Sequence, residues 1–100
     1  GRAPGFKGGE LVDGTVVRVV DYGVFFAVGK GRPLLCHVSE LMRPVEKYDV
    51  GERVQGLEVF WDEGREFPNL TEFSEANGGE EARTASYKEK AASQMREAVG

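Results

Sequence analysis

The chain has little of what would place it in several large classes of protein. Its single cysteine, Cys36, cannot form an internal disulfide, so a secreted fold held by disulfides is excluded and a reducing compartment is favoured. No apolar run approaches the roughly 20 residues needed to cross a bilayer, so we expect no membrane span. With one histidine beside that one cysteine, the chain lacks a His/Cys set for a metal, and we expect no metal, no cofactor and no catalytic residue.

Positive charge is also scarce, since 13 Lys and Arg face 17 Asp and Glu and the net charge is −4. Binding to phosphates depends on Lys and Arg, so this balance at first argues against a nucleic-acid partner. The deficit is local, however. Residues 1–61 hold eight basic and eight acidic side chains, whereas residues 62–100 hold five against nine. The acidity therefore belongs to the C-terminal part of the chain.

Short β-rich segments separated by turns make up most of the chain. Residues 1–9 contain four glycines and a proline and are predicted to be a flexible linker. Runs of β-branched and aromatic residues predict five strands, over residues 11–20, 24–28, 34–38, 53–61 and 65–71. Ser39 is expected to cap a short helical turn over residues 40–42, which Pro44 ends. This order predicts an all-β fold, a five-stranded antiparallel Greek-key barrel of the OB type over residues 10–73.

The last segment, residues 74–100, is acidic and rich in Ala and Glu, and it forms either a helix or a flexible linker. Tyr87, Ala91, Met95 and Ala98 recur at near-helical spacing, but this stripe is thin and would bury little. The sequence leaves open whether a helix packs on the barrel. It also leaves open an autoinhibitory role, in which this acidic segment covers a binding surface of the barrel.

The alternation of the second and third strands points two ring side chains outward. Val24, Phe26 and Val28 share one face with Leu34, Cys36 and Val38, and this apolar face is predicted to be the barrel interior. Phe25 and His37 therefore point outward, and Tyr22 lies at the turn beside them. Such rings form a platform on which bases can stack, with phosphate contacts expected from Arg18, Lys30 and Arg32. Trp61 is expected to pack at the core or the barrel rim.

Five sequence blocks follow one another in a specific order. They are Gly14-Thr15-Val16-Val17, Asp21-Tyr22-Gly23-Val24-Phe25-Phe26, His37-Val38-Ser39-Glu40-Leu41, Val50-Gly51-Glu52-Arg53-Val54 and Asp62-Glu63-Gly64-Arg65. Together they resemble the S1 RNA-binding domain family over residues 8–72. The resemblance implies that Tyr22, Phe25, His37, Asp62 and Arg65 form a nucleic-acid face. In it, Arg65 would reach a phosphate, and Asp62 would orient a base or Arg65.

Two departures from the family pattern carry structural expectations. Gly56 and Glu58 stand where the family keeps apolar residues, and the apolar alternation resumes one residue out of phase at Leu57, which predicts a β-bulge at Gln55-Gly56. The fifth strand contains Pro68, which confines it to an edge or a bulge. It also ends in acidic residues where the family usually has lysine, so we expect weak RNA binding.

These observations predict a non-catalytic module that binds single-stranded RNA, either mRNA or rRNA, with little sequence specificity. Because the chain begins with Gly rather than Met, we expect a monomeric domain of a larger protein. The resemblance implies a translation-related parent, such as a ribosomal protein or an initiation or elongation factor, or else an RNA-degrading enzyme. The expected location is either the cytoplasm or an organelle, for example the plastid stroma of a chloroplast. The alternative function is a protein-interaction barrel that docks on a ribosomal or other protein.

Overall fold

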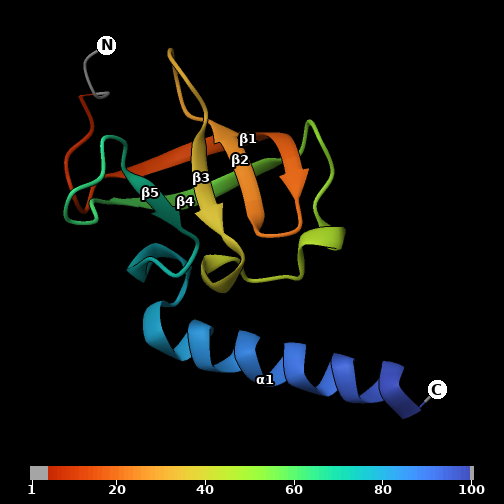
Figure 1. Cartoon of the computed structure of the whole chain (residues 1–100). Coiled ribbons are helices and arrows are strands. Elements are labelled where there is room, and N and C mark those ends of the chain that lie inside the picture. The colour runs from red at the N-terminus through yellow and green to blue at the C-terminus, as the bar shows by residue number, and fades with distance from the viewer. Residues whose placement is uncertain (1–4, 100) are drawn as a thin grey trace.

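A small barrel with a long helix across one end makes up the molecule (Figure 1). The computed structural model describes residues 5–99. The strands are β1 (Leu11–Val20), β2 (Gly23–Ala27), β3 (Leu34–His37), β4 (Arg53–Phe60) and β5 (Asn69–Thr71). Short 3-10 turns η1 (Val38–Glu40), η2 (Val45–Lys47) and η3 (Glu75–Asn77) connect them and lead to helix α1 (Gly79–Val99). The predicted all-β barrel is thus confirmed, and the C-terminal segment is a helix.

The strands form one antiparallel sheet in the order β3-β2-β1-β4-β5. The two outer strands, β3 and β5, lie side by side, so the sheet curls into a nearly closed barrel (Figure 1). This is the OB-type arrangement that the strand pattern predicts.

The barrel interior is apolar and tightly buried. Val24, Phe26 and Cys36 are 0% exposed, and Leu34 and Val28 are buried with them, as the strand alternation predicts. The prediction for Val38 is wrong, because β3 ends at His37 and Val38 begins η1, where it is only half-buried. The alternation therefore holds only as far as the chain stays in the sheet.

The predicted bulge in β4 is present. Val12 pairs with Leu57 and Gly14 with Val54, so Gln55 and Gly56 together oppose the single residue Asp13. Gly56 adopts φ +72, and a Cβ there would lie 2.9 Å from the Asn77 amide. The position therefore requires glycine, and beyond it Leu57 and Val59 point inward.

The helical turn after β3 begins earlier than predicted and has a different cap. The predicted turn at residues 40–42 with a Ser39 cap is replaced by η1, whose N-cap is His37. The backbone N–H of Ser39 donates to His37 Nδ1 at 3.2 Å. The imidazole nitrogen of His37 accepts a hydrogen bond in the place of the side-chain oxygen of a usual N-cap residue. The sequence pattern does not reveal that a histidine takes this role.

The edges of the last two strands differ from the sequence prediction. β5 contains only residues 69–71, because Pro68, which is buried, cannot donate to a strand ladder. Trp61 lies just beyond β4 at the barrel rim, is 39% exposed, and donates from Nε1 to the Phe6 carbonyl at 3.2 Å.

Part of the predicted N-terminal linker packs on the barrel. Phe6 packs against the core, and Gly9 N donates to Val59 O. Residues 6–9 of the predicted linker thus contact the barrel, whereas residues 1–4 lie outside the described residues.

Helix α1 crosses the end of the barrel where η1 lies (Figure 1). Its first half docks there, and its second half extends past the barrel. The stripe of Tyr87, Ala91, Met95 and Ala98 is exposed, and of its four members Tyr87 contacts the barrel, through its hydroxyl on the Ser39 carbonyl. Within residues 5–99, no helix is both long and apolar enough to span a membrane.

Candidate nucleic-acid interface

Three ring side chains, Tyr22, Phe25 and His37, lie together on the outer face of β2 and β3. The rings of Tyr22 and Phe25 meet edge-on, with centroids 6.2 Å apart and planes at 85°. His37 pairs with Gly23 across the β2–β3 ladder. A Cβ at position 23 would lie 2.5 Å from the Cys36 carbonyl oxygen, so glycine permits this close approach. We call these three residues the aromatic platform.

The imidazole of His37 is held by its neighbours. Its Nδ1 lies 2.9 Å from Ser39 Oγ and accepts from the Ser39 backbone N–H. Because Nδ1 accepts from an N–H, the neutral ring carries its proton on Nε2. His37 is exposed, so the platform presents a hydrogen-bond donor as well as aromatic rings.

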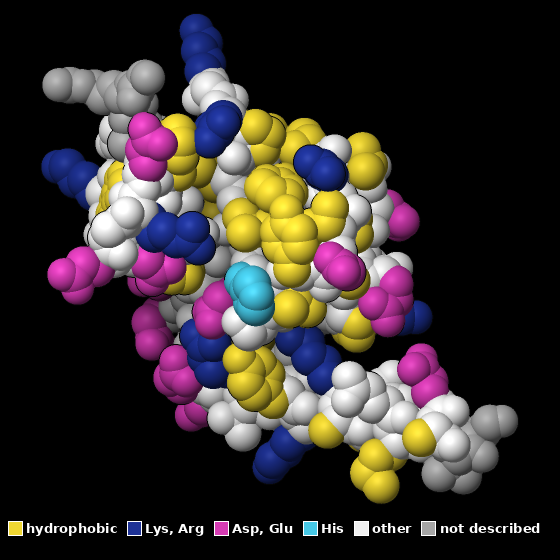
Figure 2. Space-filling model, in the orientation of Figure 1, with side chains coloured by type: hydrophobic (Ala, Val, Ile, Leu, Met, Phe, Trp, Pro, Cys, Tyr) yellow, Lys and Arg dark blue, Asp and Glu magenta, His cyan; other side chains and the backbone are white. Residues whose placement is uncertain are grey.

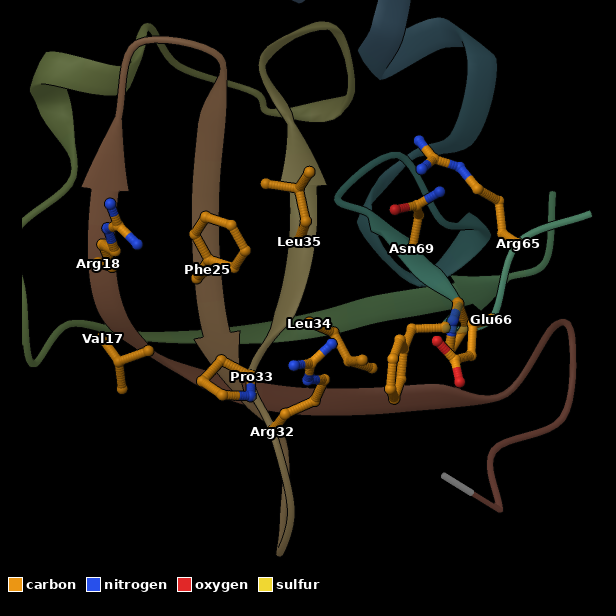
Figure 3. Close-up of a pocket in the computed structure, with 12 residues that line it drawn as sticks. Val17, Arg18, Phe25, Arg32, Pro33, Leu34, Leu35, Arg65, Glu66 and Asn69 are labelled. Carbon is orange, nitrogen blue, oxygen red and sulfur yellow. The ribbon is translucent and has the colours of Figure 1, made fainter. Parts of the chain in front are cut away.

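A groove of about 750 Å³ lies beside the platform, between the outer faces of β1–β3 and the segment that leads into β5 (Figure 3). Phe25 and Leu35, paired across β2 and β3, line its middle. Arg18 stands on the far side of Phe25 from Arg65 in Figure 3, and its Cζ lies 5.9 Å from the Phe25 ring centroid. The groove is therefore apolar in the middle and cationic at both sides.

The charge of the groove differs from that of the whole chain. Its charged lining residues are Arg18, Arg32 and Arg65 against one carboxylate, Glu66. The net charge of −4 thus leaves a local cationic surface intact. Figure 2 shows this face, with a central hydrophobic patch, both Lys/Arg and Asp/Glu side chains around it and the single histidine in cyan at its edge.

The structure brings most of the residues predicted from the sequence to this face, but not all. Phe25, Arg18, Arg32 and Arg65 line the groove, and Tyr22 and His37 lie at its margin through the platform. Lys30 sits exposed in the loop between β2 and β3 and does not line the groove. Asp62 is also outside the lining. Its Oδ2 accepts from Asn69 Nδ2 at 2.7 Å, so it orients Asn69 rather than Arg65.

Sequence reasoning missed several residues of the groove, among them Leu35, Phe67 and Asn69. Leu35 shares the outward phase of His37 and could have been found from the same alternation. Phe67 belongs to the irregular segment before β5, and Asn69 is the first residue of that three-residue strand, which is too short to show a periodicity. The guanidinium of Arg32 lies over the Phe67 ring, with Cζ 4.2 Å from its centroid, a cation–π contact that links the two sides of the groove.

Cys36 and His37 do not combine into a reactive pair. Burial raises the pKa of the Cys36 thiol well above its ordinary value, and the side chain is 0% exposed. His37 points to the opposite, outer face. Over residues 5–99, no group of three His, Cys, Asp or Glu side chains is placed to hold a metal ion.

Helix α1 leaves the platform open. Tyr22 is 47% exposed and His37 is exposed, whereas α1 contacts the residues that follow β3. The helix therefore does not cover the platform as an autoinhibitory segment would.

Comparisons with known proteins agree with the barrel fold. The model of the S1 RNA binding domain matches residues 6–56, about half of the chain. The polyribonucleotide nucleotidyltransferase of Desulfosudis oleivorans is 46% identical over 41 residues, which are 41% of this chain and 5% of that protein.

Two solved structures share the fold. GSP13 from Bacillus subtilis has a TM-score of 0.57 and 28% identity, covering 71% of this chain and 58% of that one. The alpha subunit of aIF2 from Pyrococcus abyssi has a TM-score of 0.55 and 27% identity, covering 66% of this chain and 28% of that one. The chain belongs to the S1 RNA-binding domain family, and it is an RNA-binding module on an OB-type barrel.

Proposed function

We propose that this domain binds single-stranded RNA, with little sequence preference, on the aromatic platform and the adjoining groove. The observation that carries the proposal is the continuity of the two. Phe25 belongs to both, and Arg18, Arg32 and Arg65 line the groove beside it. Bases stack on such rings, and guanidinium groups follow the phosphates.

Single-stranded RNA fits this surface better than a duplex does. The platform consists of ring faces, and only an unpaired base can place its own face against them. One N–H of the Asn69 amide already donates to Asp62, and the middle of the groove is apolar, with Phe25 and Leu35. Stacking accepts any base, so little sequence preference follows.

Modest affinity is also part of the proposal. Three arginines line the groove, and one of them, Arg32, is stacked on Phe67. Few phosphate contacts mean a shallow dependence of affinity on salt. A domain of this kind gains from neighbours in a longer chain, because linked modules bind with a high effective concentration.

A larger parent protein is proposed as the setting. A translation-related parent is supported by the likeness to the aIF2 alpha subunit, and a second candidate, an RNA-processing enzyme, by the identity to a polyribonucleotide nucleotidyltransferase. The free, buried Cys36 fits a reducing compartment, either the cytoplasm or a plastid stroma. The sequence on either side of the domain in its native chain would distinguish between these two candidate parent proteins. Cell fractionation would test the location.

The test is a titration of the 100-residue chain with a short fluorescent oligouridylate, followed by anisotropy and by amide NMR shifts. We expect shifts to cluster on Tyr22, Phe25, His37 and Arg65. Phe25→Ala should weaken binding by about 5- to 100-fold, since stacking contributes about 1–3 kcal/mol per base. Met95→Ala, which removes a 69% exposed side chain on α1, is the matched control and should bind as the wild type does.

Two outcomes would overturn this proposal. One is saturating RNA that shifts other surfaces and leaves the platform unchanged. The other is a Phe25→Ala chain that keeps its RNA affinity but loses a protein partner in a nuclease-treated pull-down. That second result would favour the protein-interaction barrel instead.

A further inference from the structure

Helix α1 carries an exposed aromatic ring next to the platform. Tyr87 is 43% exposed, and its hydroxyl donates to the Ser39 carbonyl at 2.8 Å. Ser39 is the residue whose hydroxyl lies 2.9 Å from His37 Nδ1. Tyr87 and His37 thus both contact Ser39, and α1 brings a fourth ring to the edge of the platform.

The ring is held in place rather than free. Its hydroxyl is fixed on Ser39, and its ring packs at a right angle against the Phe73 ring, with centroids 6.2 Å apart and planes at 81°. A ring that is already ordered loses little entropy when a ligand stacks on it. The rest of the exposed apolar stripe consists of Ala91, Met95 and Ala98 and contains no ring.

Cationic groups flank this ring. The Lys90 ammonium lies 5.3 Å from the Tyr87 ring centroid, and Arg83 Nη1 lies 3.5 Å from the Tyr87 hydroxyl. In Figure 2 a hydrophobic side chain on the helix lies just beyond the cyan histidine, with Lys and Arg side chains on both sides of it. Arg83 is also paired with Glu40 at 2.9 Å, which leaves Lys90 as the one of these two cations with no ion pair in the described part of the chain. An exposed aromatic ring with a cation beside it is chemistry that suits a nucleotide of single-stranded RNA.

We propose that Tyr87 extends the RNA surface from the barrel onto α1, where it contacts a nucleotide beyond the one next to His37. This inference rests on the proposed function, because it continues the same RNA strand. It predicts that the binding site is longer than the platform, so that only RNA long enough to pass His37 reaches Tyr87.

A pair of variants isolates the ring from the helix contact. Tyr87→Phe and Tyr87→Leu both remove the hydroxyl that holds α1 on Ser39, but only Tyr87→Phe keeps an aromatic face. Affinities of oligouridylates of about 4 and about 10 nucleotides, a range suited to OB folds, are measured by anisotropy at one salt concentration. Tyr87→Leu should weaken the longer RNA about 5-fold and the shorter one less than about 2-fold, while Tyr87→Phe stays within about 2-fold of wild type for both.

Three outcomes would overturn the inference. If Tyr87→Leu binds both RNAs as the wild type does while Phe25→Ala weakens both, the platform binds RNA and Tyr87 does not. If Tyr87→Phe is as weak as Tyr87→Leu, the helix contact matters and the ring does not. If the wild type binds neither RNA, the proposed function and this extension both fail.

Discussion

Inside the barrel, side chains such as Phe26 and Leu57 are fully buried and apolar, whereas helix α1 reaches the barrel through polar groups. Ser86 Oγ donates to Met42 O at 2.6 Å, Lys90 Nζ to Leu41 O at 2.5 Å, and Arg83 pairs with Glu40 at 2.9 Å. Among the described residues, the core cluster draws no member from α1. The barrel therefore owes its stability to apolar burial and the helix owes its position to a few directional contacts.

This difference teaches that the two regions should respond to different perturbations. Apolar burial is non-directional and large in sum, so a cavity in the core lowers the stability of the whole barrel. A polar contact at the surface contributes about 1 kcal/mol, so its loss should release the helix and leave the barrel folded. The predictions below test that separation.

The largest effect is expected for Phe26→Ala. The side chain is 0% exposed at the centre of the core, and its removal leaves a cavity. The free energy of unfolding, measured by urea denaturation with circular dichroism, should fall by about 3–5 kcal/mol. A loss under about 1 kcal/mol would show that the barrel does not depend on this core. Met95→Ala, on the exposed part of α1, serves as the control.

Glu72→Ala should come next, because Glu72 joins the barrel to the segment that leads into α1. It is 6% exposed, and its Oε1 accepts from the Tyr48 hydroxyl and from Met42 N at 2.9 Å. Burial and the Glu72 carboxylate raise the pKa of Tyr48, so its hydroxyl stays a donor. Removal of the carboxylate leaves two donors without their acceptor and should cost about 2–3 kcal/mol in the same assay.

Tyr48→Phe in the Glu72→Ala background gives the check on that prediction. It removes one of the two orphaned donors and should recover part of the lost stability. No recovery would mean that the carboxylate acts through other contacts.

Arg83→Ala should change the barrel little and α1 more. Arg83 donates two hydrogen bonds to Glu40 at 2.9 Å and lies over the Phe73 ring with Cζ 4.8 Å from its centroid. The unfolding free energy should fall by about 1 kcal/mol or less. Hydrogen exchange at Ser86 and Lys90 should speed up while that of β2 stays unchanged. Faster exchange throughout the barrel would contradict the separation of the two regions.

The smallest effect is expected from mild acid, and it should act on the helix contact first. Burial would raise the pKa of Glu40, but hydrogen bonds from Arg83 and Thr71 outweigh it, and the pKa lies below its ordinary value of 4.5. A lowered pKa in the folded state means that the contact is fully present above 4.5 and is lost as the pH falls through the lower, folded value. Lys90 and Glu72 also face this site.

The measurement is the amide NMR shift of Ser86 during acid titration. The Ser86 shift should begin to change only below pH 4.5, the ordinary pKa of Glu40. Between neutral pH and pH 4.5 the shift should stay constant. Glu40→Gln removes the titrating group and should make the Ser86 shift independent of pH in this range. An unchanged profile in that variant would assign the transition to another carboxylate.

The sequence predicted best where periodicity governs the chain. The two-residue period placed Phe25 and His37 outside and Phe26 and Cys36 inside. It also located the bulge at Gly56, because a change of phase in a strand requires an extra residue. These features follow from neighbours in the chain and need no knowledge of what packs against them.

The prediction failed where contacts between distant segments decide. Leu35 and Arg18 meet Phe67 and Asn69 in one groove only because β3 and β5 close the barrel. The apolar stripe of α1 pointed to Tyr87 but not to the polar residues that dock the helix, because the barrel end offers the carbonyls of Leu41 and Met42. Such carbonyls require donors, and Ser86 and Lys90 provide them.

The sequence by itself determined the barrel, its inward and outward faces and the family to which the domain belongs, because strand alternation and turn residues act locally. Only the tertiary structure decided that the groove is cationic in an acidic chain, that His37 caps η1, and that Tyr87 lies beside the platform. Each of these depends on which segments meet when the barrel closes and α1 docks, and long-range contacts of that kind leave no periodic signal in the sequence.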